Sequence, residues 1–206
     1  MSKYPIIVFE GIETSGKSTS LKKAIKYLKK NKIKYISFRE PGGTNLSEKL
    51  RQLMLNKKSK LNNKTDLFLL MASRSENFDK ILKQNYKQKV ILIDRFIDST
   101  LAYQHYGMGL DKNLILKMNN FLLGNLKPNF TFLNVVNRKN MINRLKSRKN
   151  INKYDNFKYN FYNNVQKGFL KIANKNKSKY LILDSNKDSL KIIENKLINK
   201  IENILK

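Results

Sequence analysis

The chain has 206 residues, of which 40% are hydrophobic, and this is enough to bury the core of one domain. It contains no cysteine, which excludes disulfide bonds and cysteine-ligated metal sites. The first apolar run is too short for the core of a signal peptide, and no later run approaches a membrane span. We therefore expect a single cytoplasmic domain over residues 1–206, without a membrane partner.

The charge is strongly positive, with 43 basic and 15 acidic side chains and a net charge of +28. Such an excess usually suggests a nucleic-acid partner. Here, however, the lysines are spread over nearly every segment and come with abundant asparagine and isoleucine, a mixture typical of AT-rich coding sequences. A nucleic-acid platform would gather its charge on one face or tail. We expect no specific nucleic-acid partner, although a basic surface would attract polyphosphates.

The first predicted strand, residues 6–9, leads into the segment EGIETSGKST. Its glycine spacing matches the P-loop, with a strand before it and a predicted helix, 17–30, after it. Backbone N–H groups of such a loop surround an anion, and the helix directs its positive end at the same point. In this motif the lysine reaches the β- and γ-phosphates, and the serine hydroxyl holds Mg²⁺. The predicted nucleotide site comprises Gly11, Ile12, Glu13, Thr14, Ser15, Gly16, Lys17, Ser18 and Thr19.

The rest of the chain alternates between strand and helix patterns. Continuous runs of β-branched and aromatic residues, as in buried parallel strands, predict further strands at 35–38, 90–93, 130–136 and 180–183. Helical patterns lie between them at 46–55, 66–86, 111–123, 139–149, 157–174 and 188–205. This alternation predicts an α/β fold: a three-layer P-loop NTPase fold with a five-stranded parallel sheet flanked by helices. Ligands are expected at the carboxyl ends of the strands.

The third predicted strand ends in Asp94 and is followed by Arg95. P-loop proteins place at this point the acid that steadies Mg²⁺, so we predict Ser18 and Asp94 as metal ligands. Asp94 could instead cap a following helix. That alternative does not need the arginine, whereas a guanidinium beside the metal could clamp an acceptor phosphate by paired hydrogen bonds.

Two helical faces combine apolar and hydrogen-bonding side chains. In the helix predicted at 66–86, one stripe contains Leu67, Leu70, Met71 and Arg74, and it could form the floor for a flat base with a donor at its edge. An ordinary core face whose arginine reaches solvent is the alternative. A second face would hold Thr100, Tyr103 and Gln104 if a helix begins at DSTLAYQ. Helix capping by Ser99 or Thr100 explains only part of that pattern.

The segments EGIETSGKST, FREPGGT and DRFIDSTLAYQ, in this order, resemble thymidylate kinases of the bacterial type, and the resemblance runs nearly end to end. It implies an enzyme of dTTP biosynthesis that uses ATP and Mg²⁺ to convert dTMP to dTDP, usually as a homodimer. Members place a carboxylate, here Glu13, near the deoxyribose 3′-hydroxyl. Arginines matching Arg39 and Arg95 bind the dTMP phosphate, and Arg74 matches the arginine at the thymine edge. The tyrosine matching Tyr103 crowds out a ribose 2′-hydroxyl.

The residues and the resemblance together give two sets of site residues beyond the nucleotide loop. The predicted catalytic residues are Glu13, Lys17, Arg95, Arg148 and Lys153. The predicted residues of the dTMP site are Glu13, Arg39, Pro41, Leu70, Arg74, Arg95, Ser99, Thr100, Tyr103 and Gln104.

The chain departs from the family pattern at several points. Leu70 stands where a phenylalanine commonly stacks on thymine, so stacking is weakened or comes from Phe68. Thr14 stands where the eukaryotic type has a catalytic arginine. In the bacterial type this charge comes from a short basic lid, which we place at 144–158.

The predicted lid supplies three cations. Arg144 is expected to bind the nucleotide, and Arg148 and Lys153 to act in catalysis, although Lys153 stands where the family has arginine. Ordinary solvated charge is the alternative for each. For the chain as a whole, the alternatives are another pyrimidine nucleoside monophosphate kinase and a nucleic-acid-associated P-loop NTPase.

Overall fold

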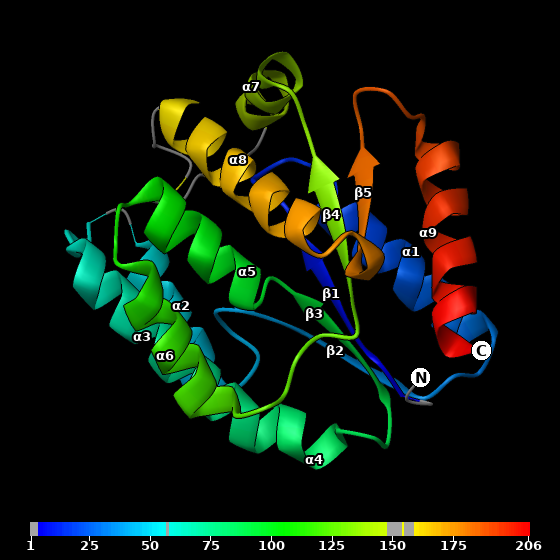
Figure 1. The fold of residues 1–206 in the computed structure, drawn as a ribbon, viewed down its shortest axis with the longest axis horizontal. Coiled ribbons are helices and arrows are strands. Elements are labelled where there is room, and N and C mark those ends of the chain that lie inside the picture. The colour runs from blue at the N-terminus through cyan, green and yellow to red at the C-terminus, as the bar shows by residue number, and fades with distance from the viewer. Residues whose placement is uncertain (1–3, 57, 148–153, 155–158) are drawn as a thin grey trace.

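A computed structural model describes residues 4–56, 58–147, 154 and 159–206 (Figure 1). Most of the predicted lid, with Arg148 and Lys153, lies outside these residues. Across the described ranges, no helix is long and apolar enough to cross a membrane.

Five parallel strands form one sheet in the order β2-β3-β1-β4-β5. The strand bounds are Ile6–Glu10 for β1, Tyr35–Arg39 for β2, Val90–Asp94 for β3, Phe130–Val135 for β4 and Tyr180–Asp184 for β5. All five predicted strands are confirmed. The three inner strands are buried almost throughout, but the edge strands β2 and β5 leave several side chains partly exposed.

Helical elements connect the strands in the order that the sequence predicts. The α-helices are α1 (Lys17–Lys30), α2 (Asn45–Leu55), α3 (Asn63–Asn77), α4 (Lys83–Asn85), α5 (Ile97–Thr100), α6 (Lys112–Leu123), α7 (Arg138–Lys146), α8 (Tyr159–Lys175) and α9 (Leu190–Leu205). Two π-helical segments, η1 (Phe78–Leu82) and η2 (Leu101–Gly107), continue α3 and α5, and η4 (Lys177–Lys179) is a 3₁₀ turn. The helix predicted at 188–205 begins later, because the side chain of Ser189 caps it by accepting from the Ile192 N–H.

The sheet forms the middle of three layers (Figure 1). Helices α1 and α9 cover one face, where Leu28 and Ile201 pack on Phe9 and Phe132. On the other face, α8 and η2 pack beside β4, and η1 and α6 reach β1 and β3. The central strand β1 pairs with both β3 and β4, so its carboxyl end lies at the point where the connections leave in opposite directions. Ligand sites of open α/β sheets form at such points.

Candidate active site

A cleft of about 870 Å³ opens at the carboxyl ends of the strands. Its walls come from the loop after β1, the ends of β2 and β3, helices α2 and α3, the η2 segment and the start of α9. The predicted site residues that line it are Ile12, Glu13, Thr14, Ser15, Gly16, Lys17, Ser18, Thr19, Arg39, Pro41, Leu70, Arg74, Asp94, Arg95, Ser99, Thr100, Tyr103, Gln104 and Arg144.

The loop between β1 and α1 has the backbone of an anion site. Gly16 is the N-cap of α1 with φ +97°, a left-handed conformation that favours glycine, and it has no side chain to occupy the helix N-terminus. The buried Ser15 Oγ has no partner within the described part of the chain. Gly11 is not among the residues that line the cleft, and its part in nucleotide binding stays a prediction. A glycine is required at this position because a Cβ there would lie 2.4 Å from the Asn134 carbonyl oxygen of β4.

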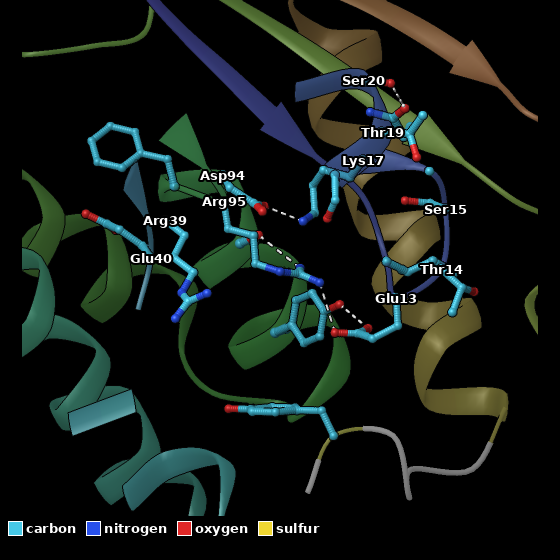
Figure 2. Close-up of a pocket in the computed structure, with 18 of the residues that line it drawn as sticks. Glu13, Thr14, Ser15, Lys17, Thr19, Ser20, Arg39, Glu40, Asp94 and Arg95 are labelled. Carbon is cyan, nitrogen blue, oxygen red and sulfur yellow. Dashed lines mark hydrogen bonds and ion pairs between the residues drawn. The ribbon is translucent and has the colours of Figure 1, made fainter. Parts of the chain in front are cut away.

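Lys17 projects from the first turn of α1 and forms an ion pair with Asp94 at the end of β3 (Figure 2). Burial, together with the nearby Arg95, lowers the pKa of Lys17, whereas Asp94 opposes this shift. The cap alternative for Asp94 is wrong, because Phe96 is the N-cap of α5. Ser18 is exposed to the cleft, close in sequence to this ion pair. A carboxylate and a hydroxyl oxygen are donors that suit Mg²⁺.

Glu13, Arg95 and Tyr103 form a cluster in the middle of the cleft. The Arg95 guanidinium donates to Glu13 at 2.9 Å (Figure 2). It also lies over the Tyr103 ring, 4.9 Å from its centroid. The Tyr103 hydroxyl donates to the other Glu13 oxygen at 2.5 Å. This cluster joins the P-loop to the turn after β3 and to η2, so its three members are held in a fixed arrangement.

Three arginines line the part of the cleft near β2. Arg39 pairs with Glu48 at 2.8 Å, Arg51 donates to the Pro41 carbonyl at 2.9 Å, and Arg95 is the third. Burial and the charges of Arg39 and Arg95 lower the pKa of Arg51 to about 10. An anion between these guanidinium groups would relieve their repulsion. Sequence reasoning missed Arg51, because in the sequence it resembles the many other basic residues. Only the position of α2 in the fold brings it to the cleft.

Arg74 on α3 is almost fully buried at the bottom of the cleft. Its guanidinium donates to Glu40 at 2.7 Å, to Thr100 Oγ1 at 3.0 Å and to Asn119 Oδ1 at 2.5 Å. Burial raises the pKa of Glu40 and Arg74 opposes this shift. Sequence reasoning assigned no role to Glu40, although it lies in the FREPGGT segment. The Glu40–Pro41 peptide bond is cis.

The predicted apolar floor is only partly correct. Leu70 lines the cleft with Arg74, but Leu67 and Met71 pack into the core against Ile115 and Leu101. Successive helical positions spread over a wide arc, and only one edge of this stripe reaches the cleft. Phe68 points away and is 58% exposed, so the alternative that it supplies stacking within this chain is wrong.

The predicted helical face of Thr100, Tyr103 and Gln104 is confirmed, since α5 and η2 are continuous and all three line the cleft. Thr100 is inside the helical segment and does not cap it. The Gln104 amide nitrogen donates to Asp66 at 3.0 Å. Its buried carbonyl oxygen has no partner among the residues that the structure describes, and so leaves one acceptor in the cleft.

Arg144 of α7 also lines the cleft. It donates to the Thr14 carbonyl at 2.9 Å and to Ser185 Oγ at 3.1 Å, and so links α7 to the P-loop and to the turn after β5. Tyr154, within the predicted lid, also lines the cleft and donates to Asp66 at 2.7 Å. Sequence reasoning assigned it no role.

The strand–loop–helix unit and the order of the parallel sheet define the class of protein: this is a P-loop NTPase fold. The family model "Thymidylate kinase" matches residues 9–197. The chain belongs to the thymidylate kinase family.

Individual relatives agree with this assignment. The chain is 35% identical to a thymidylate kinase of Kosmotoga olearia, over 91% of each chain. It is 40% identical to one of Wolbachia pipientis, over 81% of this chain and 84% of the other. A crystal structure of thymidylate kinase from Ehrlichia chaffeensis superposes with a TM-score of 0.75 at 32% identity, over 98% of this chain and 97% of that one.

Proposed function

We propose that this chain transfers the γ-phosphoryl group of ATP to dTMP in the cleft described above. The observation that carries the proposal is the pairing of two unlike anion sites in one cleft. The P-loop with Lys17 suits a triphosphate, and the guanidinium groups of Arg39, Arg51 and Arg95 suit a second, separate phosphate. An enzyme that transfers a phosphoryl group from one nucleotide to another needs both sites.

Base recognition follows from one donor and one acceptor. Arg74 lines the cleft, and its bonds to Glu40, Thr100 and Asn119 leave one N–H of Nη2 to donate to a base. The Gln104 carbonyl oxygen, which has no partner among the described residues, would accept a hydrogen bond. Thymine and uracil offer a carbonyl oxygen and a ring N–H in the matching order. Cytosine offers an amino group and an unprotonated ring nitrogen, and so leaves both protein groups unpaired. The Tyr103 hydroxyl donates to Glu13, and in the proposed complex the Tyr103 ring would exclude a ribose 2′-hydroxyl.

The residues act by positioning and by charge neutralisation. Phosphoryl transfer spreads charge over the oxygens of the transferred group. Lys17 meets this charge from the donor side, and Arg95, which Glu13 already holds in place, meets it from the acceptor side. Glu13 orients Arg95 and lies where the sugar 3′-hydroxyl is expected. Arg144 joins the nucleotide-binding set, and Arg148 and Lys153 remain predicted sources of further positive charge.

The donor set also fits a magnesium ion. Ser18 and Asp94 would hold it together with phosphate oxygens and water, and Lys17 would then leave Asp94 for the phosphates. The ion supplies neutralisation of phosphate charge and alignment of the reacting oxygens.

We further propose that the chain forms a homodimer through the outer face of α3 and α6. Phe121 is 86% exposed, and Phe68 and Leu114 are also largely exposed on these two helices. Between the helices Met71 and Met118 line an apolar hollow of about 410 Å³. A second copy would bury this face. Light scattering after size exclusion tests this, and a monomer at micromolar concentration would contradict it.

A coupled assay of diphosphate formation tests the activity. With ATP and Mg²⁺, dTMP should be the preferred acceptor, dUMP should react to a lesser extent, and dCMP, AMP and GMP should be poor substrates. A preference for dCMP would contradict the proposed base contacts and favour another pyrimidine nucleotide kinase. Hydrolysis of ATP that is stimulated by DNA rather than by dTMP would contradict the proposal as a whole.

A further inference from the structure

Glu10 is the last residue of β1 and has a fully buried carboxylate. Both carboxylate oxygens accept hydrogen bonds from the start of α5. Oε1 accepts from the Phe96 N–H at 2.8 Å and from the Ser99 N–H at 3.2 Å. Oε2 accepts from the Ser99 hydroxyl at 2.5 Å. Phe96 is the N-cap of α5 and cannot cap the helix itself. Glu10 therefore performs the capping role from the neighbouring strand.

These contacts surround Arg95, which immediately precedes Phe96. Arg95 has φ +68°, a left-handed conformation that is costly for a residue other than glycine, and its N–H donates to the Phe9 carbonyl at 3.0 Å. The Arg95 backbone is thus held on both sides by the end of β1. Its side chain is held as well, because Nη1 donates to Ser99 Oγ at 3.4 Å.

The direction of the hydrogen bonds depends on Glu10 being an acceptor only. An ionised carboxylate forces the Ser99 hydroxyl to donate to it. The lone pairs of Ser99 Oγ then remain for the Arg95 guanidinium. A donor at the Glu10 position would reverse this order and compete with Arg95 for the same oxygen.

We propose that Glu10 is a positioning residue for the acceptor phosphate, acting through Ser99 and the backbone of the turn to hold Arg95 in place. The inference rests on the proposed function and deepens it. It assigns a role to Glu10, which does not line the cleft. It also means that the carboxyl end of β1 contributes to both phosphate sites, because Gly11 begins the loop of the donor site and Glu10 holds the arginine of the acceptor site.

The positioning role of Glu10 should depend on pH, because its surroundings shift the pKa of its carboxyl group. Burial, followed by the nearby Asp98 of α5, raises the pKa of Glu10 to about 7, while its hydrogen bonds and Arg95 oppose the shift. Lys17 of α1 and Tyr180 of β5 are the other titratable groups that interact with it, and the Tyr180 hydroxyl donates to Asp98 at 2.7 Å. A protonated Glu10 would donate to Ser99 and disturb Arg95.

The test is Glu10→Gln, which keeps the size and one acceptor oxygen but presents a donor to Ser99. We expect the KM for dTMP to rise about tenfold, the scale of losing one charge-assisted hydrogen bond, and the KM for ATP to change less than about twofold. In a Ser99→Ala background the same change should add little, because the link to Arg95 is already absent. Ile201→Ala, a buried change in α9 away from the cleft, controls for lost stability.

The pH profile of kcat/KM for dTMP gives a second readout. The wild-type profile should fall below pH 7, and Glu10→Gln should flatten that fall, leaving the contribution of the substrate phosphate near pH 6. If the wild type is active on dTMP and Glu10→Gln lowers only thermal stability, as Ile201→Ala does, the positioning role is overturned. If the wild type does not phosphorylate dTMP, the proposed function itself fails.

Discussion

The two sides of the cleft are built in different ways. The donor side is mainly one continuous segment, residues 12–19, which runs from the loop after β1 into the first turn of α1. The acceptor side gathers residues from four separate elements and from the turn after β3: Arg39, Arg51, Arg74, Gln104 and Arg95. A local motif therefore identifies the first side from sequence alone. The second side forms only when the sheet order places β3 beside β1 and β2 beside β3.

The two sides also differ in how their charges are balanced. On the donor side Lys17 pairs with one carboxylate among the residues that the structure describes, that of Asp94, and both side chains line the cleft. On the acceptor side Arg74 and Glu40 form a pair that is 1% exposed at both ends, inside a network with Thr100 and Asn119. We expect substitutions on the acceptor side to affect folding as well as binding, and those on the donor side to affect mainly turnover.

The largest expected effect is therefore on stability, from Arg74→Met. Removing the guanidinium leaves Glu40 buried without its cation, which costs about 3–5 kcal/mol of unfolding free energy. Adding Glu40→Gln should restore a large part of this loss. Denaturant unfolding measures both variants. The loss should be smaller at pH 5 than at pH 8, because a protonated Glu40 no longer needs the cation. A double variant no more stable than Arg74→Met would contradict this account.

Lys17→Ala comes next and should reduce turnover by about 10²-fold or more, the scale of removing one preorganised electrostatic group. The KM for dTMP should change little, because Lys17 acts on the donor phosphates. Lys22→Ala removes an equal charge from the exposed side of the same helix and serves as the control. Unchanged turnover in the Lys17 variant would remove the basis for its proposed role.

Arg51→Ala should show the opposite kinetic pattern. We expect the KM for dTMP to rise about tenfold or more and the KM for ATP to remain near its wild-type value, since a charged hydrogen bond to phosphate is lost. Lys49→Ala, an exposed position of α2, is the matched control for charge. Steady-state kinetics with each substrate varied in turn decide the question. Equal increases in both KM values would place Arg51 between the two sites.

The same contrast explains what the sequence could predict. The strands, most helices, the P-loop and Asp94 follow from local patterns, and the structure places them as expected. The roles of Arg51 and Glu40 could not be predicted from local patterns, because they depend on which side chains from other elements face these two residues. The stripe on α3 was misread for a related reason: periodicity places Leu67 and Leu70 on one side of a helix, but only packing decides which of them meets the core.

The smallest effects come from a matched pair of helix caps. Thr44 caps α2, which carries Arg51, and Ser189 caps α9, which packs beside α1 and carries none of the acceptor arginines. Replacing either by alanine should cost about 1 kcal/mol of stability. Only Thr44→Ala should also raise the KM for dTMP, because loosening the first turn of α2 displaces the helix that places Arg51. Thermal unfolding and kinetics of both variants test this. If the two caps changed the dTMP KM equally, the acceptor site would depend on overall stability rather than on the placement of α2.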